Sequence, residues 1–443
     1  MYLIYSIVLA LGMVAIAPWW LLRDSPDGRY RRFLGERFGR VPLPAPGAIW
    51  IHAVSVGEAL AVERLIGQLR QRFPGRPVVL SVTTPTGRSV AMRRIAADQI
   101  FYFPLDFRFA VRRSLRAIRP HLVLIAETEI WPNFLREAAL QSVPVIFING
   151  RVSGRSYARY RLIRRLLRPT LAHAAQFLMQ TPTDAERILD LGAAPAQVQV
   201  AGNLKFDLIP PEQPGFLGLM RQRVADAGIV EVLVAGSTME GEEAAVLEAY
   251  RAVLAVTVSP LLLVLAPRHP PRFDKVAELL RDSGLPWLRR SQLDERRTEL
   301  DSRPLPAGGV LLLDSLGELA TVYQLAASAF IGGSLAPHGG HNILEPAYWG
   351  VPVVFGPHME NFALIAEQFL AAGAALRASS PLELGHLWRQ LLADSALRAR
   401  IGGAARELLL SQRGATDRAL EVIAATLEAR ASAPATIATP AAP

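Results

Sequence analysis

The chain has 443 residues, of which 51% are hydrophobic, 20% are charged and none is cysteine. This length predicts two or three domains with substantial cores, and the composition excludes disordered and fibrous proteins. The lack of cysteine excludes disulfide frameworks, thiolate zinc sites, iron–sulfur clusters and cysteine nucleophiles. A formal net charge of +9 favours anionic partners, and nucleic acid, acidic lipid and phosphorylated substrates are all compatible with it.

The first 22 residues contain no charged side chain and are long enough for a helix that spans a membrane. They lack the basic start and the small-residue cleavage site of a secretory signal, so we expect residues 1–22 to remain as a membrane anchor. The juxtamembrane segment 23–47 is basic, and the positive-inside rule predicts catalytic domains on the cytoplasmic face. The alternative is a helix that lies in the membrane interface or docks on the protein.

Short apolar runs alternate with helical stretches from residue 49 onward, and the pattern restarts after Pro210, Pro211 and Pro214. This is typical of βαβ units around buried parallel sheets. We therefore predict an α/β protein with Rossmann-like, doubly wound domains at 48–206 and 230–430, and we expect a ligand cleft between them. A linker is expected at 207–229 and a disordered tail at 431–443. The expected strands are 49–54, 78–82, 121–126, 143–149, 176–180, 230–236, 261–266, 310–314, 329–333 and 351–355.

The first candidate site follows the first expected strand, in the sequence 52–58. Glu58 comes after a tight turn at the carboxyl end of this strand, where residues line the crevice of an open α/β sheet and a general base can meet an acceptor hydroxyl. Ser55 and Gly57, in the same turn, are secondary candidates. Ser55 and Glu58 fit a helix capping box equally well, and the residues alone leave the two interpretations even.

Two carboxylates, Glu127 and Glu129, follow the expected strand 121–126, and Pro132 opens the next helix. This position suits acid–base or charge-stabilising work, Glu127 more than Glu129, whose charge equally favours the helix N-terminus. Lys205 lies at the domain junction, where a lysine can neutralise a phosphate or an oxyanion. Taken alone, such a lysine is more often a solvated surface charge.

The segment Arg151 to Arg168 contains seven arginines and no acidic residue, with apolar residues at helical spacing. A basic amphipathic helix of this kind favours anionic lipid or the phosphates of a lipid substrate. The alternative is a solvated arginine face over ordinary core packing. Nucleic acid is not expected as a partner, because no recognition motif accompanies the patch.

The second expected domain carries nucleotide-type features at its strand ends. Ser237 and Thr238 follow its first strand and are expected to begin a helix whose amides hold phosphate, although Ser237 also fits a capping box. Arg268 follows the next strand, and arginine contacts phosphate through a charge-assisted fork. Gly317 permits close approach of a ligand to a helix N-terminus, in a segment that also matches a capping box.

A glycine-rich loop between a buried strand and a helix is more informative. Such a loop cradles phosphate or ribose, and a glutamate one turn into the helix can accept both ribose hydroxyls. We predict neither a metal site nor a cofactor, because His338 and His341 lack a third ligand and the chain has no Asp-x-Asp triplet. A monophosphate leaving group fits better. The loop contains Gly332, Gly333, Ser334, His341, Asn342, Ile343, Leu344 and Glu345.

Together, these motifs resemble the 3-deoxy-D-manno-octulosonic acid (Kdo) transferases of lipopolysaccharide synthesis. The resemblance implies a GT-B fold, with an N-terminal acceptor domain and a C-terminal domain that binds CMP-Kdo. It further implies the tetra-acylated lipid A precursor as acceptor and the inner membrane as location. The motifs occur in family order at 52–58, 83–87, 127–133, 202–207, 267–270, 317–319 and 332–346.

The same resemblance implies roles for single residues. Glu58 matches the catalytic base, which takes a proton from the acceptor hydroxyl while that hydroxyl attacks Kdo with inversion and CMP leaves. Glu127 and Lys205 match the family's transition-state stabilisers. The family's CMP contacts match Pro267, Arg268, Leu316, Gly317, Glu318, Asn342, Ile343, Leu344 and Glu345.

Two other classes are open at this point. A sugar-nucleotide epimerase of similar architecture shares the two domains but needs neither a membrane segment nor a basic lipid-facing helix. A membrane-bound scaffold would bind nucleotide without turnover, and it leaves the carboxylates unexplained.

Overall fold

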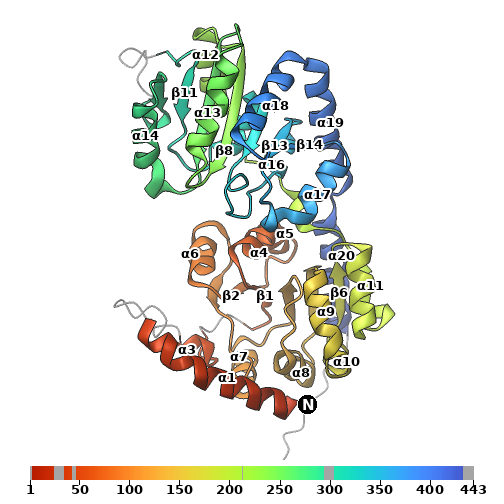
Figure 1. Cartoon of the computed structure of the whole chain (residues 1–443). Coiled ribbons are helices and arrows are strands. Elements are labelled where there is room, and N and C mark those ends of the chain that lie inside the picture. Colours follow the sequence, from red (N-terminus) through yellow and green to blue (C-terminus); the bar gives the residue numbers. More distant parts are fainter. Residues whose placement is uncertain (1, 24–33, 42–45, 212, 294–303, 433–443) are drawn as a thin grey trace, which may run out of the picture. The chain divides into compact units, whose positions relative to one another are not determined.

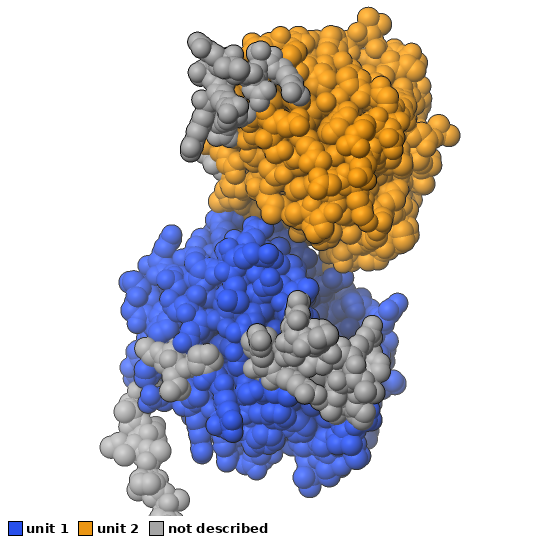
Figure 2. All heavy atoms as spheres, turned by 90° about the vertical axis from the view of Figure 1, so that its left-hand side faces the viewer, with its two compact units in different colours: residues 1–207, 412–443 blue, residues 208–411 orange. Residues whose placement is uncertain are grey.

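A computed structural model describes residues 2–23, 34–41, 46–211, 213–293 and 304–432, without the side chains of 16–23. The chain divides into two compact units, coloured separately in Figure 2. Unit 1 comprises Met1–Asp207 and Gln412–Pro443, and unit 2 comprises Leu208–Ser411. The expected basic segment 23–47 lies mostly outside the described residues, and the expected tail 431–443 almost wholly so.

Unit 1 is built on a parallel sheet with the strand order β3-β2-β1-β4-β5-β6-β7. Its central strands are buried on both faces, which agrees with their largely apolar sequences, although β1 also contains the buried His52. The strands are β1 (Ile49–Ala53), β2 (Val78–Val82), β3 (Gln99–Tyr102), β4 (Leu122–Ala126), β5 (Val145–Gly150), β6 (Gln176–Met179) and β7 (Val198–Val200).

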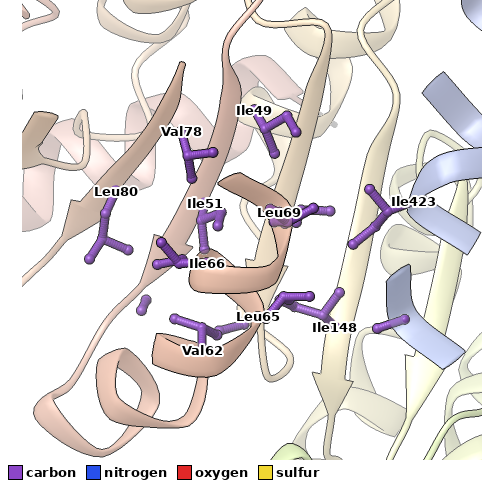
Figure 3. Close-up of a cluster of buried hydrophobic side chains, with 14 of the residues drawn as sticks. Ile49, Ile51, Val62, Leu65, Ile66, Leu69, Val78, Leu80, Ile148 and Ile423 are labelled. Carbon is purple, nitrogen blue, oxygen red and sulfur yellow. The ribbon is translucent and has the colours of Figure 1, made fainter. Parts of the chain in front are cut away.

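Helices cover both faces of this sheet (Figure 1). On one face, Ile51 and Ile148 of the sheet pack with Leu65 and Leu69 of α5 and with Ile423 of α20 (Figure 3). On the other, Trp50, Phe101 and Phe147 pack with residues of α7, α8 and α11. The helices of unit 1 are α1 (Tyr2–Arg23), α3 (Leu34–Arg37), α4 (Val56–Ala61), α5 (Glu63–Arg72), α6 (Pro85–Arg94), α7 (Arg108–Ile118), α8 (Pro132–Leu140), α9 (Gly154–Leu162), α10 (Arg164–Leu171), α11 (Pro182–Leu191) and α20 (Ala415–Ser432).

The place of α20 corrects the expected extent of the second domain, 230–430. Asp207 Oδ1 accepts the Gly414 N–H at 2.6 Å and Asp207 Oδ2 accepts the Thr416 N–H at 2.5 Å. Leu427 is buried in the same core cluster as Ile49 and Ile423. The chain therefore returns to unit 1 after residue 411, because the apolar side of α20 covers the sheet of unit 1.

Unit 2 repeats the architecture with a second parallel sheet, ordered β10-β11-β9-β8-β12-β13-β14. Its strands are β8 (Glu231–Thr238), β9 (Leu261–Pro267), β10 (Trp287–Arg289), β11 (Gly309–Leu312), β12 (Ser328–Ile331), β13 (Val353–Phe355) and β14 (Ala375–Arg377). Its helices are α12 (Pro214–Asp226), α13 (Glu243–Leu254), α14 (Phe273–Asp282), α15 (Leu319–Val322), α16 (Leu344–Tyr348), α17 (Ala363–Ala371), α18 (Pro381–Ala393) and α19 (Ser395–Ser411).

The expected linker 207–229 differs from the structure. Most of it forms α12, whose Phe216 and Met220 are buried in the core of unit 2 with Val234 and Val264. The two units instead meet in sequence at Asp207, which ends a short 3-10 helix.

Helix α1 contacts the rest of unit 1 through polar residues. A hydrogen bond of 3.0 Å joins the Tyr2 hydroxyl to His173 Nε2, and Asn133 Nδ2 donates to Ser6 Oγ at 3.0 Å. The Arg136 guanidinium lies 4.6 Å from the centre of the Tyr2 ring. Among the described residues, no helix is both long enough and apolar enough to cross a membrane, so the expected spanning anchor is not shown. The other side of α1 exposes Leu3, Ile4, Ile7, Val8, Leu11 and Val14.

Candidate active site

The carboxyl ends of the unit 1 strands bring together the three residues predicted to be catalytic. Glu58 lies in the first turn of α4 after β1, Glu127 directly follows β4, and Lys205 lies in the 3-10 turn Leu204–Asp207 after β7. Burial raises the pKa of Glu58 and Glu127 adds to this rise, while burial lowers the pKa of Lys205 and both carboxylates act to raise it. The ends of parallel strands meet at one edge of a sheet, which explains how residues far apart in sequence form one cluster.

Glu58 combines the two arrangements that the sequence left open. Ser55 caps α4 by accepting the Glu58 N–H at 3.3 Å, and its hydroxyl donates to Glu58 Oε1 at 2.9 Å. Glu58 Oε2 accepts the Val54 N–H at 2.8 Å, where a capping box would use the amide of the cap residue. Burial raises the pKa of Glu58 to about 7, against the lowering effect of the Val54 hydrogen bond. The pKa of this capping carboxylate is therefore close to neutral pH, which is the range that suits a general base.

Glu127 has a strained backbone. Its φ of 56° lies in the left-handed region, which side chains other than glycine seldom adopt, and its N–H donates to Ile148 O at 2.9 Å. Strain of this kind costs about 1–3 kcal/mol and is concentrated at functional sites. The neighbouring Glu129 belongs to the same cluster, since burial and then the charge of Glu127 raise its pKa. The clustering goes against a purely helix-capping role for Glu129.

Two asparagines hold the backbone at Lys205. Asn149 Oδ1 accepts the Leu204 N–H and Asn203 Oδ1 accepts the Lys205 N–H, each at 3.0 Å. Burial lowers the pKa of the Lys205 ammonium, while Glu127 acts to raise it. Asn149, buried with a φ of 54°, is a positioning residue that sequence reasoning missed, although its place at the end of β5 could have indicated it.

The arginine-rich segment borders this cluster at two points. The Arg151 N–H donates to Thr128 Oγ1 at 2.9 Å, and Arg151 acts on the pKa of Lys205. Burial and then Glu129 raise the pKa of Tyr160. The single helix expected over 151–168 is wrong: α9 and α10 are separate, because the chain leaves helical geometry at Ile163, where ψ is 18°.

In unit 2, the residues after β9 and β12 form a second group. Pro267 ends β9 and is buried, Arg268 is exposed, and the Arg268 N–H donates to Thr238 O at 3.0 Å. Burial and then Arg268 lower the pKa of His341 to about 4. The His341 Nε2 atom is buried and has no hydrogen-bond partner within the described part of the chain. The structure thus brings Arg268 and His341 together.

The start of α16 is held by its own side chains. Asn342 Oδ1 accepts the Leu344 N–H at 3.0 Å, and Asn342 Nδ2 donates to Glu345 Oε1 at 3.2 Å. Ile343 and Leu344 are buried, so their side chains anchor the segment around Asn342 and Glu345 in the core of unit 2. The predicted CMP contacts at Asn342 and Glu345 are therefore fixed in place.

Glu318 has a partner that the sequence did not indicate. Its carboxylate binds the guanidinium of Arg290, Oε1 to Nη2 at 2.7 Å and Oε2 to Nε at 3.1 Å, and it also accepts from the Ser315 hydroxyl. Leu316 is 70% exposed, and Gly317 has a φ of 91° that suits glycine. At this strand end, Leu316 and Gly317 are open to a ligand, whereas the charge of Glu318 is already balanced.

Several glycine-loop candidates serve the fold instead. A Cβ on Gly332 would lie 2.3 Å from Ser237 O, so this glycine lets two chain segments pass closely. Thr238 is fully buried and, with Ser237, ends β8 rather than beginning a helix. The N–H groups of Gly333 and Ser334 donate to Glu242 Oε2 and Oε1 at 2.6 and 2.9 Å. The phosphate-binding amides predicted here are therefore already bonded within the protein.

No group of three or more His, Cys, Asp or Glu side chains in the described part of the chain is placed to hold a metal ion. Instead, His338 Nε2 forms a hydrogen bond of 3.1 Å with Glu240 O.

Residues 32–208 match the family model described as 3-deoxy-D-manno-octulosonic-acid transferase (kdotransferase). The chain is 35% identical to a 3-deoxy-D-manno-octulosonic acid transferase of Haemophilus influenzae, over 90% of this chain and 92% of the relative. It is 37% identical to the enzyme of the same name from Bordetella pertussis, over 94% and 98%. The fold is similar to that of MurG from Acinetobacter baumannii, with a TM-score of 0.53, 16% identity, and coverage of 86% of this chain and 100% of the other.

Proposed function

Since the chain belongs to the family of 3-deoxy-D-manno-octulosonic acid transferases, we propose that it moves Kdo from CMP-Kdo to the tetra-acylated lipid A precursor and releases CMP. Membership of this family decides against the epimerase considered above. The observation that carries the proposal is Glu58, a carboxylate that is 8% exposed, with a pKa raised to about 7, beside Glu127 and Lys205. Such a group suits general-base activation of a hydroxyl.

In the proposed reaction, Glu58 accepts the proton of the acceptor hydroxyl. The hydroxyl oxygen forms a bond to the anomeric carbon of Kdo from the side opposite the phosphate. The bond from that carbon to the phosphate oxygen breaks, and CMP leaves with the electron pair. Glu127 supports this step by favouring the protonated form of Lys205, whose charge stabilises the negative charge that develops on the phosphate.

The donor would be held by unit 2. Arg268, exposed at the end of β9, supplies a fork of N–H donors for the phosphate of CMP. Asn342 and Glu345, tied to each other at 3.2 Å, offer polar atoms for the ribose. Leu316 and Gly317 offer an open surface for the rest of the nucleotide.

The acceptor would be met at the surface of the inner membrane, with the catalytic domains on its cytoplasmic face. Docking of α1 through Tyr2 and Ser6 leaves its apolar side exposed, which suits a helix that lies flat in the interface. The segment 151–168 adds arginines next to Leu162 and Leu166, which are 86% and 52% exposed. This combination favours anionic lipid.

The test of transfer is incubation with CMP-Kdo and the tetra-acylated lipid A precursor, followed by mass spectrometry of the lipid. We expect the mass of one or more Kdo residues to be added, and far slower addition with Glu58→Gln. An unchanged lipid, under conditions where a known Kdo transferase acts, would refute the proposed reaction.

Membrane binding has a separate test, flotation with vesicles that contain phosphatidylglycerol. We expect Ile7→Ser combined with Leu11→Ser to reduce binding. The control is Leu382→Ser, which changes a leucine that is 70% exposed on α18 of unit 2. Equal loss of binding in both variants would contradict the role of α1.

A further inference from the structure

Glu242 is a fully buried glutamate immediately before α13, and its carboxylate accepts five backbone N–H groups. Converging N–H groups of this kind form the concave anion sites that hold phosphate in many nucleotide-binding proteins. Here the anion in the site is a side chain of the same protein. Oε2 accepts from Met239 and Gly333 at 2.9 and 2.6 Å, and Oε1 accepts from Ser334, Leu335 and Ala336 at 2.9, 2.8 and 3.3 Å.

The loop that Glu242 holds leads directly to the proposed donor residues. The Gly340 N–H donates to Gly333 O at 2.7 Å, which closes the loop. A Cβ on Gly333 would lie 2.9 Å from Cδ2 of His341, so the imidazole rests against this glycine. His341 in turn lies within the electrostatic reach of Arg268 and precedes Asn342. The position of Gly333, which Glu242 fixes, therefore sets the position of His341.

We propose that Glu242 is a positioning residue for the donor. Its carboxylate occupies the amides of residues 333–336, so the phosphate of the donor must be bound by side chains such as Arg268 and not by this backbone site. It also fixes the loop that carries His341, Asn342 and Glu345. The inference rests on the CMP-Kdo donor proposed above.

A purely structural role is the competing explanation, and Glu243 provides the comparison. It is also buried at the start of α13, but its carboxylate binds the guanidinium of Arg272, at 2.6 Å to Nη1 and 2.8 Å to Nη2. Loss of either glutamate should destabilise unit 2, because loss of Glu242 leaves buried N–H groups without their acceptor and loss of Glu243 removes the ion pair of the half-buried Arg272. Of these two glutamates, Glu242 is the one whose carboxylate accepts the N–H groups of residues 333–336.

The experiment uses the full chain with Glu242→Ala, which removes the same atoms that acetate contains. Titration calorimetry measures the Kd of CMP with and without added acetate at constant ionic strength. We expect the Kd to rise about 10- to 100-fold, because a charged group that holds several hydrogen bonds is lost, and we expect acetate to restore much of the affinity. The KM of the lipid acceptor should not change. Glu243→Ala should lower the Tm without any effect of acetate on CMP binding.

Two results would overturn the inference. One is a folded Glu242→Ala chain that binds CMP as tightly as the unaltered chain. The other is acetate that restores the Tm but not the affinity for CMP. If Glu242→Ala does not fold, Glu242→Gln keeps the shape and one accepting oxygen, and an affinity equal to that of the unaltered chain would again overturn it. Failure of the unaltered chain to bind CMP would overturn the proposed donor instead.

Discussion

The two units contain candidate sites of different kinds. In unit 1, burial shifts the ionisable groups and they also act on one another: burial and, to a lesser extent, Glu127 raise the pKa of Glu58 and of Glu129, and burial lowers the pKa of Lys205. In unit 2, most carboxylates at the strand ends are already bonded, as Glu318 is to Arg290. This difference agrees with the proposed function, in which unit 1 carries out proton transfer and charge stabilisation and unit 2 holds the donor in a fixed pose.

The largest expected effect tests the chemical role of unit 1. Glu58→Gln should lower kcat by about two to four orders of magnitude, because the general base is lost, and leave the Kd of CMP unchanged. Steady-state kinetics and calorimetry measure the two quantities. Glu63→Gln is the control, because Glu63 lies on the neighbouring helix and pairs with Arg94 at 3.3 Å. If Glu58→Gln changed kcat and the affinity for CMP equally, the proposed division between chemistry in unit 1 and donor binding in unit 2 would be wrong.

Lys205→Met tests the second charge of the cluster. The shape of the side chain is largely kept, and the loss of one stabilising charge should lower kcat by about two to three orders of magnitude. Single-turnover kinetics would show whether the chemical step slows. A variant with normal turnover would mean that the charge of Lys205 takes no part in the reaction.

Arg268→Ala is the matching test of unit 2. Since a charge-assisted hydrogen bond to phosphate is lost, the KM of CMP-Kdo should rise about 10- to 100-fold, with a smaller change in kcat. Arg268→Lys should be intermediate, because lysine keeps the charge but not the fork of donors. A decrease in kcat with an unchanged KM would mean that Arg268 acts in the chemical step, against a purely donor-binding role for unit 2.

The pH dependence of kcat/KM should reveal the base of unit 1. Burial raises the pKa of Glu58 to about 7, and its protonated form cannot accept a proton, so activity should fall about tenfold per pH unit below about 7. A second fall is expected at alkaline pH, because the pKa of Lys205 is lowered from 10.5. A flat profile between pH 5 and 8 would contradict the assignment of Glu58.

The smallest expected effect concerns stability. The folded-state pKa of Glu58 is above its ordinary value of 4.5, so ionisation of this carboxyl destabilises the folded state as pH rises from 4.5 through about 7. Glu58→Gln should therefore increase the free energy of unfolding by about 1–3 kcal/mol at pH 8 but not at pH 4. Urea unfolding at the two pH values measures this. An equal change in the free energy of unfolding at pH 4 and pH 8 would show that ionisation of Glu58 does not destabilise the folded state.

The sheets could be predicted from the sequence wherever a strand is buried on both faces. The ten expected strands overlap β1, β2, β4, β5, β6, β8, β9, β11, β12 and β13 and are confirmed. The strands β3, β7, β10 and β14 were missed because they are short and lie toward the sheet edges, where partly exposed residues break the apolar run, as at Gln99 and Val200. Edge strands carry too weak a pattern to stand out from loops.

The candidate site was predictable where a residue follows a buried strand, as Glu58, Glu127 and Arg268 do. It was not predictable where its geometry depends on partners distant in sequence. Glu242 meets residues more than 90 positions away, and Asn149 meets Leu204. Nothing in the local pattern around Glu242 distinguishes it from Glu243. The same limit explains why α20 was assigned to the wrong domain, because only its packing on Ile49 and Ile148 reveals where it belongs.

The return of α20 to unit 1 has a consequence for synthesis on the ribosome. Residues 208–411 emerge as one continuous segment, so unit 2 is complete before the last helix of unit 1 has been made. Until then, the sheet of unit 1 lacks the side chains of Ile423 and Leu427 that cover its apolar face. The unit whose synthesis begins first is therefore completed last, and a chain that ends before α20 would lack the helix that completes the core of the unit with Glu58.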